Sequence, residues 1–249
     1  MLSYRAIEPQ DCVALVELHH RAFDDGENGT TVFLSPRVKY YLQQLASVAR
    51  RQNEYFLYGA LYGGKLIGYV WGKALQKTWH LNYLAVASEF QGKGIGRALY
   101  EQWLETGKQK GYREYSLDVS EQNRQAFDWY RRLGWQLAST TYCYIRQLSA
   151  SPGWDASNMR IRGWEAAQAW QHCYGFSEFY VVDQQKQWKI GRLAEEYFRI
   201  NDPPPAVVEW LLRELDPARK LLLFVPDEIS GSLPVKISHR LHLSAYRFY

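Results

Sequence analysis

The strongest constraint on the fold is a glycine-rich turn, Gln91-Gly92-Lys93-Gly94-Ile95-Gly96, placed between two apolar segments of different periodicity. Trp79–Val86 before the turn has the composition of a buried strand, whereas Ile95, Leu99 and Trp103 after it recur at helical spacing. Glycines allow positive φ values and the close approach of a ligand. Because the first N–H groups of a helix lack internal partners, we predict an anion site at this helix N-terminus.

The charges and the spacing of the turn narrow the choice of ligand. Lys93 and Arg97 add positive charge, which favours a pyrophosphate, although these residues alone fit a tight turn without a ligand equally well. The dinucleotide-binding pattern GxGxxG is excluded because Leu99 stands where its third glycine would be, and no GK[ST] of an NTPase loop is present.

Around this turn, the first 148 residues alternate short strands with amphipathic helices, as in a mixed α+β (α/β) fold. Strands are expected at residues 2–7, 55–62, 65–71, 79–86 and 114–119, followed by extended chain over 135–148. Helices are expected after Pro9-Gln10-Asp11, from Ser35-Pro36 to about Arg51, from Ile95, and from Asn123 to Leu133. The Gly63-Gly64 pair predicts a tight hairpin between the second and third strands.

Ser149-Ala150-Ser151-Pro152-Gly153 has the composition of a linker. The following residues repeat the order strand, helix, hairpin, strand, helix, strand, with one late helix missing. We therefore predict two domains, 1–150 and 151–249, of which the second is a degenerate copy; an unrelated α+β appendage is the alternative.

Composition excludes several protein classes. The 249 residues carry a formal net charge of +4, which is too small to indicate a nucleic-acid or membrane partner. Cys12, Cys143 and Cys173 form neither a disulfide framework nor a metal site, so no metal is expected. Without a signal peptide or an apolar run of membrane-spanning length, a cytoplasmic location is expected.

Two motifs give the chain a family resemblance over residues 2–148. Leu84-Ala85-Val86 followed by Gln91-Gly92-Lys93-Gly94-Ile95-Gly96 is similar to the acetyl-CoA motif [RQ]xxGx[GA] of the GNAT superfamily of N-acetyltransferases. Asn123 to Trp135 resembles the family segment NxxAxxxYxxxG[FW]. The resemblance implies a central twisted sheet flanked by helices, followed here by a truncated second GNAT-like unit.

The resemblance also assigns residues to acetyl-CoA, the expected co-substrate. The backbone of Leu84, Ala85 and Val86 would hold the pantetheine arm. The pyrophosphate would lie on the turn and the first helical residues, namely Gln91, Gly92, Lys93, Gly94, Ile95, Gly96 and Arg97. Asn123 would cap the next helix and contact pantetheine, although the cap alone explains it equally well.

Two catalytic residues follow from the same comparison. Tyr130 occupies the position at which the family often carries the acid that protonates the CoA thiolate. His80 stands where many members carry a glutamate base, so the base is open among His80, Asp118, Glu121 and water, and a structural histidine is an alternative. The acidic loop with Asp24, Asp25 and Glu27 would attract a cationic amine or only be solvated.

These assignments predict acetyl transfer to a primary amine of unknown identity, either a small amine or a protein amino group, by direct attack in a ternary complex. A non-catalytic acetyl-CoA-binding or interaction module is the alternative function. The second unit should bind no acetyl-CoA, because Pro203, Pro204 and Pro205 have no N–H groups to donate and Asp202 would repel phosphate. The second unit would then serve for packing, as a wall of the acceptor site or as the surface of a homodimer.

Overall fold

A computed structural model describes residues 1–23, 29–49, 54–151 and 156–244. The chain divides into two compact units. The first comprises Met1–Asp25, Lys39–Ser139 and Ser238–Tyr249, and the second comprises Gly26–Val38 and Thr140–Ile237. Neither unit is continuous in sequence, whereas the predicted domains meet at a single boundary, between residues 150 and 151. The acidic loop with Asp24, Asp25 and Glu27 lies outside the described residues.

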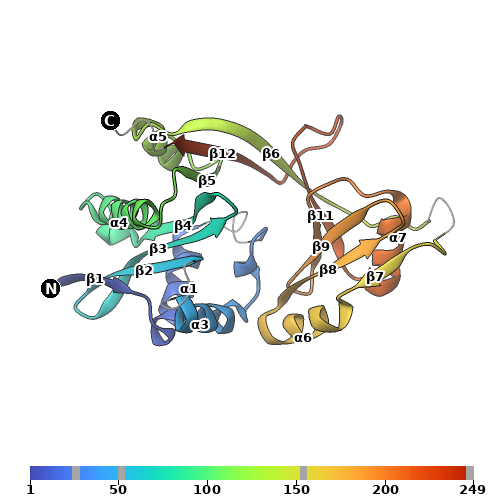
Figure 1. Ribbon diagram of the computed structural model, residues 1–249, viewed down its shortest axis with the longest axis horizontal. Helices are drawn as coiled ribbons and strands as arrows, with labels where there is room; N and C mark the ends of the chain where they lie inside the picture. Colours follow the sequence, from blue (N-terminus) through green and yellow to red (C-terminus); the bar gives the residue numbers. More distant parts are fainter. Residues whose placement is uncertain (24–28, 50–53, 152–155, 245–249) are drawn as a thin grey trace. The chain divides into compact units, whose positions relative to one another are not determined.

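The first unit is built on a mixed sheet with the strand order β1-β2-β3-β4-β5-β12-β6 (Figure 1). Its strands are β1 (Leu2–Ala6), β2 (Tyr55–Tyr62), β3 (Lys65–Leu75), β4 (Thr78–Val86), β5 (Glu114–Ser120), β6 (Gln136–Arg146) and β12 (Lys236–Ser244). Neighbours from β1 to β4 are antiparallel, β4 and β5 are parallel, and β12 is antiparallel to β5. Gly63 and Gly64 turn the β2–β3 hairpin with φ values of +57° and +82°, as their sequence predicts.

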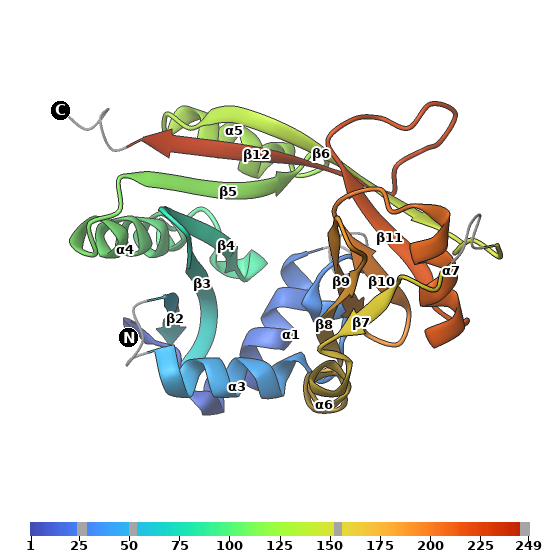
Figure 2. The same ribbon diagram turned by 45° about the vertical axis from the view of Figure 1, so that its right-hand side comes forward.

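Helices cover both faces of this sheet (Figure 2). They are α1 (Cys12–Ala22), α3 (Val38–Ala49), α4 (Ile95–Gln109) and α5 (Arg124–Arg132), with single 3₁₀ turns at Pro9–Asp11 and Ser88–Phe90. A further 3₁₀ turn, Val32–Leu34, belongs to the second unit. Ser35 does not open α3 directly. Its Oγ accepts from the N–H of Arg37 at 3.1 Å, and the helix begins only at Val38, after Pro36.

Strand alternation places the hydrophobic core of the first unit on the face that α4 and α5 cover. The core strand residues are every second residue, namely Trp79 and Leu81 of β4, Tyr115 and Leu117 of β5, and Leu241 and Leu243 of β12. They pack against Leu99 and Trp103 of α4 and Tyr130 of α5. Gly107 lets α4 approach closely, because a Cβ there would lie 2.5 Å from the Trp79 ring.

The second unit repeats the plan of the first, which confirms the predicted truncated repeat. Its strands are β7 (Arg160–Arg162), β8 (Phe176–Val182), β9 (Gln187–Leu193), β10 (Tyr197–Ile200) and β11 (Lys220–Val225), in the order β7-β8-β9-β10-β11-β6. Its helices are α6 (Trp164–Tyr174) and α7 (Ala206–Leu215). Two helices are missing and not the single late one that was predicted: residues 226–235 contain no counterpart of α5, and α6 leads directly into β8 without a counterpart of α3.

Each unit takes its final antiparallel strand from the other half of the sequence. Strand β12 pairs with β5 from Ser238 opposite Ser120 to Ser244 opposite Glu114. The second part of β6, Tyr142 to Arg146, pairs with β11. The extended segment 135–148 is therefore one long strand that runs from the first unit into the second, and the linker that follows it does not separate two independent sheets.

Candidate functional site

The glycine-rich turn has the geometry that its sequence predicts. Gly92 and Gly94 have φ values of +73° and +78°, and Gly94 is the N-cap of α4. No atom lies within 4 Å of the position that a Cβ would take at either glycine. The backbone conformation, and not crowding, therefore requires glycine at both positions, since other residues are strained at positive φ.

The turn presents a row of free backbone donors. Among the described residues, the N–H groups from Gly92 to Arg97 have no hydrogen-bond acceptor, and the first internal bond of this region runs from Ala98 to the Gly94 carbonyl. Six consecutive donors at the positive end of a 15-residue helix form a site for a multiply charged anion such as a pyrophosphate.

The side chains of the turn hold its shape. The amide Nε2 of Gln91 donates to the Val86 carbonyl at 3.0 Å and closes the loop between β4 and the turn. The Lys93 ammonium donates to the Glu89 carbonyl at 2.9 Å and lies over the Phe90 ring. Arg97 pairs with Glu101 one helical turn later, at 2.8 Å. All three side chains are at the surface, where Lys93 and Arg97 can turn towards a bound anion.

Strands β4 and β5 diverge beside this turn. They pair only from Thr78 opposite Glu114 to Leu81 opposite Leu117, although β4 continues to Val86. A β-bulge at Asn82, where the register with β3 shifts, coincides with the point of divergence. Within the part of the chain that the structure describes, residues 82–86 of β4 therefore have a strand partner on one edge only. An extended ligand can pair with the other edge by β-type hydrogen bonds.

The direction of the backbone groups on this edge follows from the register. The Ala87 N–H donates to the Ile67 carbonyl of the β3 segment, so by antiparallel alternation Ala85 also faces β3. Leu84 and Val86 then direct their N–H and C=O groups to the open edge. Because the Val86 carbonyl is taken by Gln91, the open groups are the Leu84 N–H, the Leu84 carbonyl and the Val86 N–H.

Tyr130 lies in the aromatic part of the first core, beside Tyr100, Trp129 and Trp135. Its ring is buried, and burial together with the neighbouring Tyr100 raises the pKa of its phenol above the ordinary value. The hydroxyl has no hydrogen-bond partner among the described residues, yet it does not belong to their fully enclosed polar atoms. Tyr130 is thus a protonated phenol whose hydroxyl is available to a ligand.

Asn123 caps α5. Its Oδ1 accepts from the Ala126 N–H at 3.1 Å, as predicted for a residue at this position. The cap occupies the carbonyl oxygen and leaves the amide nitrogen available, so a contact with pantetheine stays a prediction.

His80 is buried, with 5% of its surface exposed, in the paired section of β4. Its Nδ1 lies 3.0 Å from the Ser116 Oγ on β5. Burial is the main cause that lowers the pKa of His80 to about 4, so the ring is neutral at pH 7. Because His80 alternates with the core residues Trp79 and Leu81, it lies on the face of the sheet opposite Tyr130, and the two flank the divergence of β4 and β5 from opposite sides.

The other two candidate bases contact β12. Asp118 accepts two hydrogen bonds of 2.7 Å from Arg240, and Glu121 lies 3.7 Å from the His239 Nε2. Ser116 and Arg240 belong to no sequence motif, so neither could be identified from the sequence. Ser116 lies beside His80 through the parallel pairing of β4 and β5, whereas Arg240 reaches this part of the sheet through the pairing of β12 with β5, which no local pattern encodes.

The corresponding turn of the second unit differs, because Pro203, Pro204 and Pro205 interrupt its row of backbone N–H groups. All four residues of β10, Tyr197 to Ile200, pair with β11, so these parallel strands do not diverge within β10. Asp202 pairs with Lys186 at 2.5 Å, and Pro205 is the N-cap of α7.

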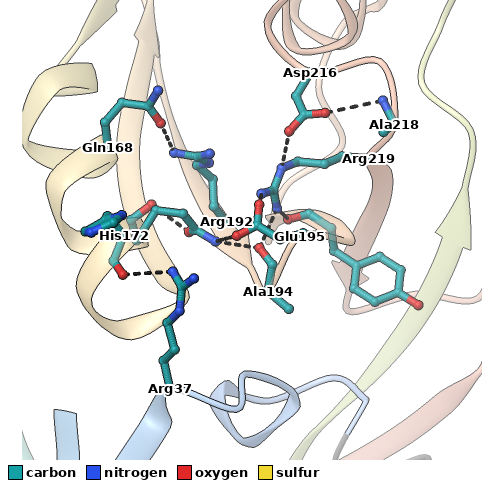
Figure 3. A network of polar contacts seen from close by, with 12 residues as sticks. Arg37, Gln168, His172, Arg192, Ala194, Glu195, Asp216, Ala218 and Arg219 are labelled. Atoms are coloured by element: carbon teal, nitrogen blue, oxygen red, sulfur yellow. Dashed lines mark hydrogen bonds and ion pairs between the residues drawn. The ribbon is translucent and has the colours of Figure 1, made fainter. Parts of the chain in front are cut away.

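The second unit instead contains a buried polar network (Figure 3). The Arg219 side chain is fully enclosed and donates to the carboxylates of Glu195 and Asp216 at 2.7 Å each, and to the carbonyls of Ala194 and Tyr197. This guanidinium fixes the β9–β10 turn, in which Ala194 has a φ of +47°. Because Arg219 has four acceptors within the second unit, we interpret the network as stabilising the structure of this unit.

Within the described ranges, no group of three or more His, Cys, Asp or Glu side chains is arranged to hold a metal ion. None of the helices in those ranges is long and apolar enough to cross a membrane.

Comparison with known proteins identifies relatives of the first unit. The family model described as the acetyltransferase (GNAT) family matches residues 13–135. An uncharacterized N-acetyltransferase of Methanocaldococcus jannaschii is 29% identical over 92 residues, a match that covers 34% of this chain and 41% of that protein. The chain thus matches about two fifths of this curated relative.

Some solved structures are similar to one unit, and others are similar to nearly the whole chain with both units. The PaiA N-acetyltransferase of Thermoplasma acidophilum, solved with coenzyme A, is 20% identical and covers 56% of this chain and 92% of its own, with a TM-score of 0.51. A tandem GNAT protein of the clavulanic acid biosynthesis pathway is 11% identical; the match covers 98% of this chain and 99% of that protein, with a TM-score of 0.63. A Pyrococcus horikoshii protein is 15% identical; the match covers 98% of this chain and 89% of that protein, with a TM-score of 0.66.

Proposed function

Because residues 13–135 are a domain of the acetyltransferase (GNAT) family, we propose that this protein uses acetyl-CoA to acetylate a primary amine by direct attack in a ternary complex. The observation that carries the proposal is the row of six unpaired N–H donors from Gly92 to Arg97 beside the open edge of β4. The row fits a pyrophosphate, and the open edge fits an extended amide-containing arm. Both features occur once, in the first unit, among the described residues.

Acetyl-CoA, when bound, supplies a thioester whose carbonyl carbon the amine attacks, so that the C–S bond breaks, an amide forms and CoA leaves as a thiol. The chain supplies the groups that this exchange needs. The Gly92–Arg97 donors hold the phosphates, and the Leu84 and Val86 backbone groups hold the arm. An N–H on this edge also faces the thioester oxygen; removing one such donor costs about 2.7–4 kcal/mol in other acyl transfers.

Tyr130 provides the proton for the departing sulfur. A thiol has an ordinary pKa near 8.5, so its thiolate readily accepts a hydrogen bond from a phenol that stays protonated at pH 7. The raised pKa of Tyr130 keeps its phenol in this form.

His80 faces the acceptor side in its neutral form. With a pKa of about 4 it is a weak base, so its role is to accept a hydrogen bond from the amine or from a water molecule that takes up the proton. The hydrogen bond between His80 and Ser116 orients the ring for this purpose. The ion pair of Asp118 with Arg240 makes this carboxylate less available as a base.

Acetyl-CoA-dependent release of free thiol, measured with a panel of small amines and lysine-containing peptides, tests the function. Turnover with any amine supports an N-acetyltransferase and identifies the acceptor class. The buried, weakly basic His80 favours one other function, a non-catalytic acetyl-CoA-binding module. That module would bind acetyl-CoA in calorimetry with no turnover for any acceptor, and absence of binding would contradict both functions.

A further inference from the structure

Residues 29–37, here called the anchored segment, lie between α1 and α3 in sequence but belong to the second unit. The Ser35 hydroxyl donates to the Tyr174 carbonyl at 2.9 Å. The Arg37 guanidinium donates to the His172 carbonyl at 2.8 Å (Figure 3). Both acceptors are in the last turn of α6, where helix carbonyls lack internal partners and a positive charge is favourable.

Apolar packing and close contact add to these two hydrogen bonds. Leu34 packs against the small core cluster of Cys143, Leu193 and Leu222. Ser35 is 1% exposed, and a Cβ at Gly175, the C-cap of α6, would collide with its hydroxyl. The anchored segment therefore fits the end of α6 without room for a further side chain.

The end of α6 is itself held by the buried network of the second unit. The Gln171 amide nitrogen donates to the Ala194 carbonyl, which also accepts from Arg219 at 2.8 Å. The Gln171 side-chain oxygen accepts from the Ser177 hydroxyl at 3.2 Å. Because such a buried network is rigid when its members are paired, the last turn of α6 is a fixed point of attachment.

In the first unit, Tyr83 lies on the side that the proposed function assigns to the acceptor amine. It belongs to the part of β4 beyond the pairing with β5. Its partner on β3 is Trp71. Lys73, two residues later, is the partner of His80, and side chains two residues apart on a strand share a face. The bulge at Asn82 therefore places Tyr83 on the same face as His80.

Helices α1 and α3 cover this face with aromatic rings. The ring centroids of His19 and Phe23, at the end of α1, lie 4.9 and 5.9 Å from that of Tyr83. Tyr41, in the first turn of α3, lies 6.3 Å from Trp71, whose ring is 5.5 Å from Tyr83. Because the anchored segment ends directly before α3, its attachment to α6 fixes where this helix begins and where Tyr41 lies.

We propose that the second unit positions the acceptor side of the first unit: it holds the anchored segment on α6, and Ser35 and Arg37 are thereby positioning residues for the acceptor amine. The proposal rests on the proposed function. It gives the second unit a role that needs no second cofactor site. Because acetyl-CoA would be held by β4 and the Gly92–Arg97 turn, the role concerns the acceptor and leaves acetyl-CoA binding unchanged.

Arg37→Ala tests the attachment from the side of the anchored segment. Loss of one hydrogen bond should raise the acceptor KM about two- to tenfold, while kcat and the Kd for acetyl-CoA stay within about twofold of the parent. Arg37→Lys can donate to the same carbonyl and should restore the parent KM. Arg213→Ala is the matched control, because Arg213 is an exposed arginine of α7 with no hydrogen bond or ion pair in the described ranges.

Gly175→Ala tests the attachment from the side of α6. Gly163, at the other end of this helix, has a similar φ of +78° against +74°, but no atom lies within 4 Å of its Cβ position. Gly163→Ala therefore introduces the same backbone strain without the collision with Ser35. Gly175→Ala should raise the acceptor KM about two- to tenfold relative to Gly163→Ala.

Hydrogen exchange of the full chain without acetyl-CoA provides a readout that does not need turnover. Arg37→Ala and Gly175→Ala should speed amide exchange in the anchored segment and in the first half of α3, with α4 unchanged. If Gly175→Ala fails to fold, Arg37→Ala decides, because Arg37 is exposed.

Unchanged exchange in α3, or faster exchange with an unchanged acceptor KM, would overturn the proposal. An equal rise of KM in Arg37→Ala and Arg213→Ala, or an equal rise of the Kd for acetyl-CoA, would overturn it as well. Absence of turnover in the parent would contradict the proposed function and would leave the exchange result readable.

Discussion

The side-chain amide of Gln91 donates to the carbonyl of Val86 at 3.0 Å, and so joins the last residue of β4 to the turn that begins α4. This bond fixes the distance between the edge that would hold the pantetheine arm and the donors that would hold the pyrophosphate. Gln91→Ala removes it without adding bulk. Because one hydrogen bond contributes about 0.5–1.5 kcal/mol, the Kd for acetyl-CoA should rise about two- to tenfold in calorimetry.

Gly96 offers a direct test of the anion site. A side chain at Gly96 is compatible with the backbone, since its Cβ would lie 3.6 Å from the nearest Val86 methyl group. Gly96→Glu should weaken acetyl-CoA binding at least about tenfold more than Gly96→Gln, because only the glutamate opposes the phosphates by charge. Circular dichroism should remain native for both. Equal affinities of the two variants would remove the phosphate assignment.

Tyr130→Phe tests the acid. The variant keeps the ring in its aromatic cluster and removes only the hydroxyl, so kcat should fall about 10²-fold while acetyl-CoA affinity changes little. The parent should show no loss of activity from Tyr130 ionisation below about pH 10, because its pKa is raised and the phenol stays protonated there.

Tyr100→Phe is the comparison for this prediction. The Tyr100 hydroxyl accepts the indole N–H of Trp135 at 2.9 Å, so its removal should lower the melting temperature and leave kcat nearly unchanged. If Tyr130→Phe behaved in the same way, Tyr130 would be a structural residue.

The number of cofactor sites can be counted by titration. The first unit has the free donors and the divergent strands, whereas the second has a proline turn and fully paired β10. Calorimetry should therefore give one equivalent of acetyl-CoA per folded chain. A stoichiometry of two would show that the second unit binds the cofactor by other means.

Removal of residues 236–249 should destabilise the first unit although its motifs remain intact. The truncation exposes one edge of β5 and removes the fully buried Leu241 and Leu243, each of which contributes about 1.5–3 kcal/mol. That is a large part of a typical stability of about 5–15 kcal/mol. Chemical denaturation followed by Trp fluorescence measures the loss.

The sequence predicts the local elements of this fold well because each is marked by its own residues. Gly63-Gly64 marks the hairpin and Gly92 with Gly94 marks the turn, since positive φ values leave few alternatives to glycine. The helix beginning at Ser35-Pro36 shows the limit of such signals. Ser35 uses its hydroxyl to cap the N–H of Arg37, and the helix starts three residues after Ser35.

Pairing between distant strands was not predictable in the same way. Residues 236–244 have no pattern that specifies β5 as their partner, because strand composition indicates burial but not the neighbour. The compact units therefore differ from a simple division after residue 150, and Arg240 could not be connected with His80. The roles of His80, Tyr130 and Asn123 stay predictions from family resemblance, which their placement now makes testable.

Because β12 is synthesised late, folding of the first unit cannot be completed until most of the chain has been made. The first unit needs Ser238–Ser244, yet the ribosome makes this segment about 100 residues after Ser139, where the N-terminal part of that unit ends. At about 5–20 residues per second, the edge of β5 stays uncovered for on the order of 5–20 s. During translation, the nascent chain therefore presents an unpaired strand edge that a chaperone can bind, and the first unit is completed only when β12 has emerged.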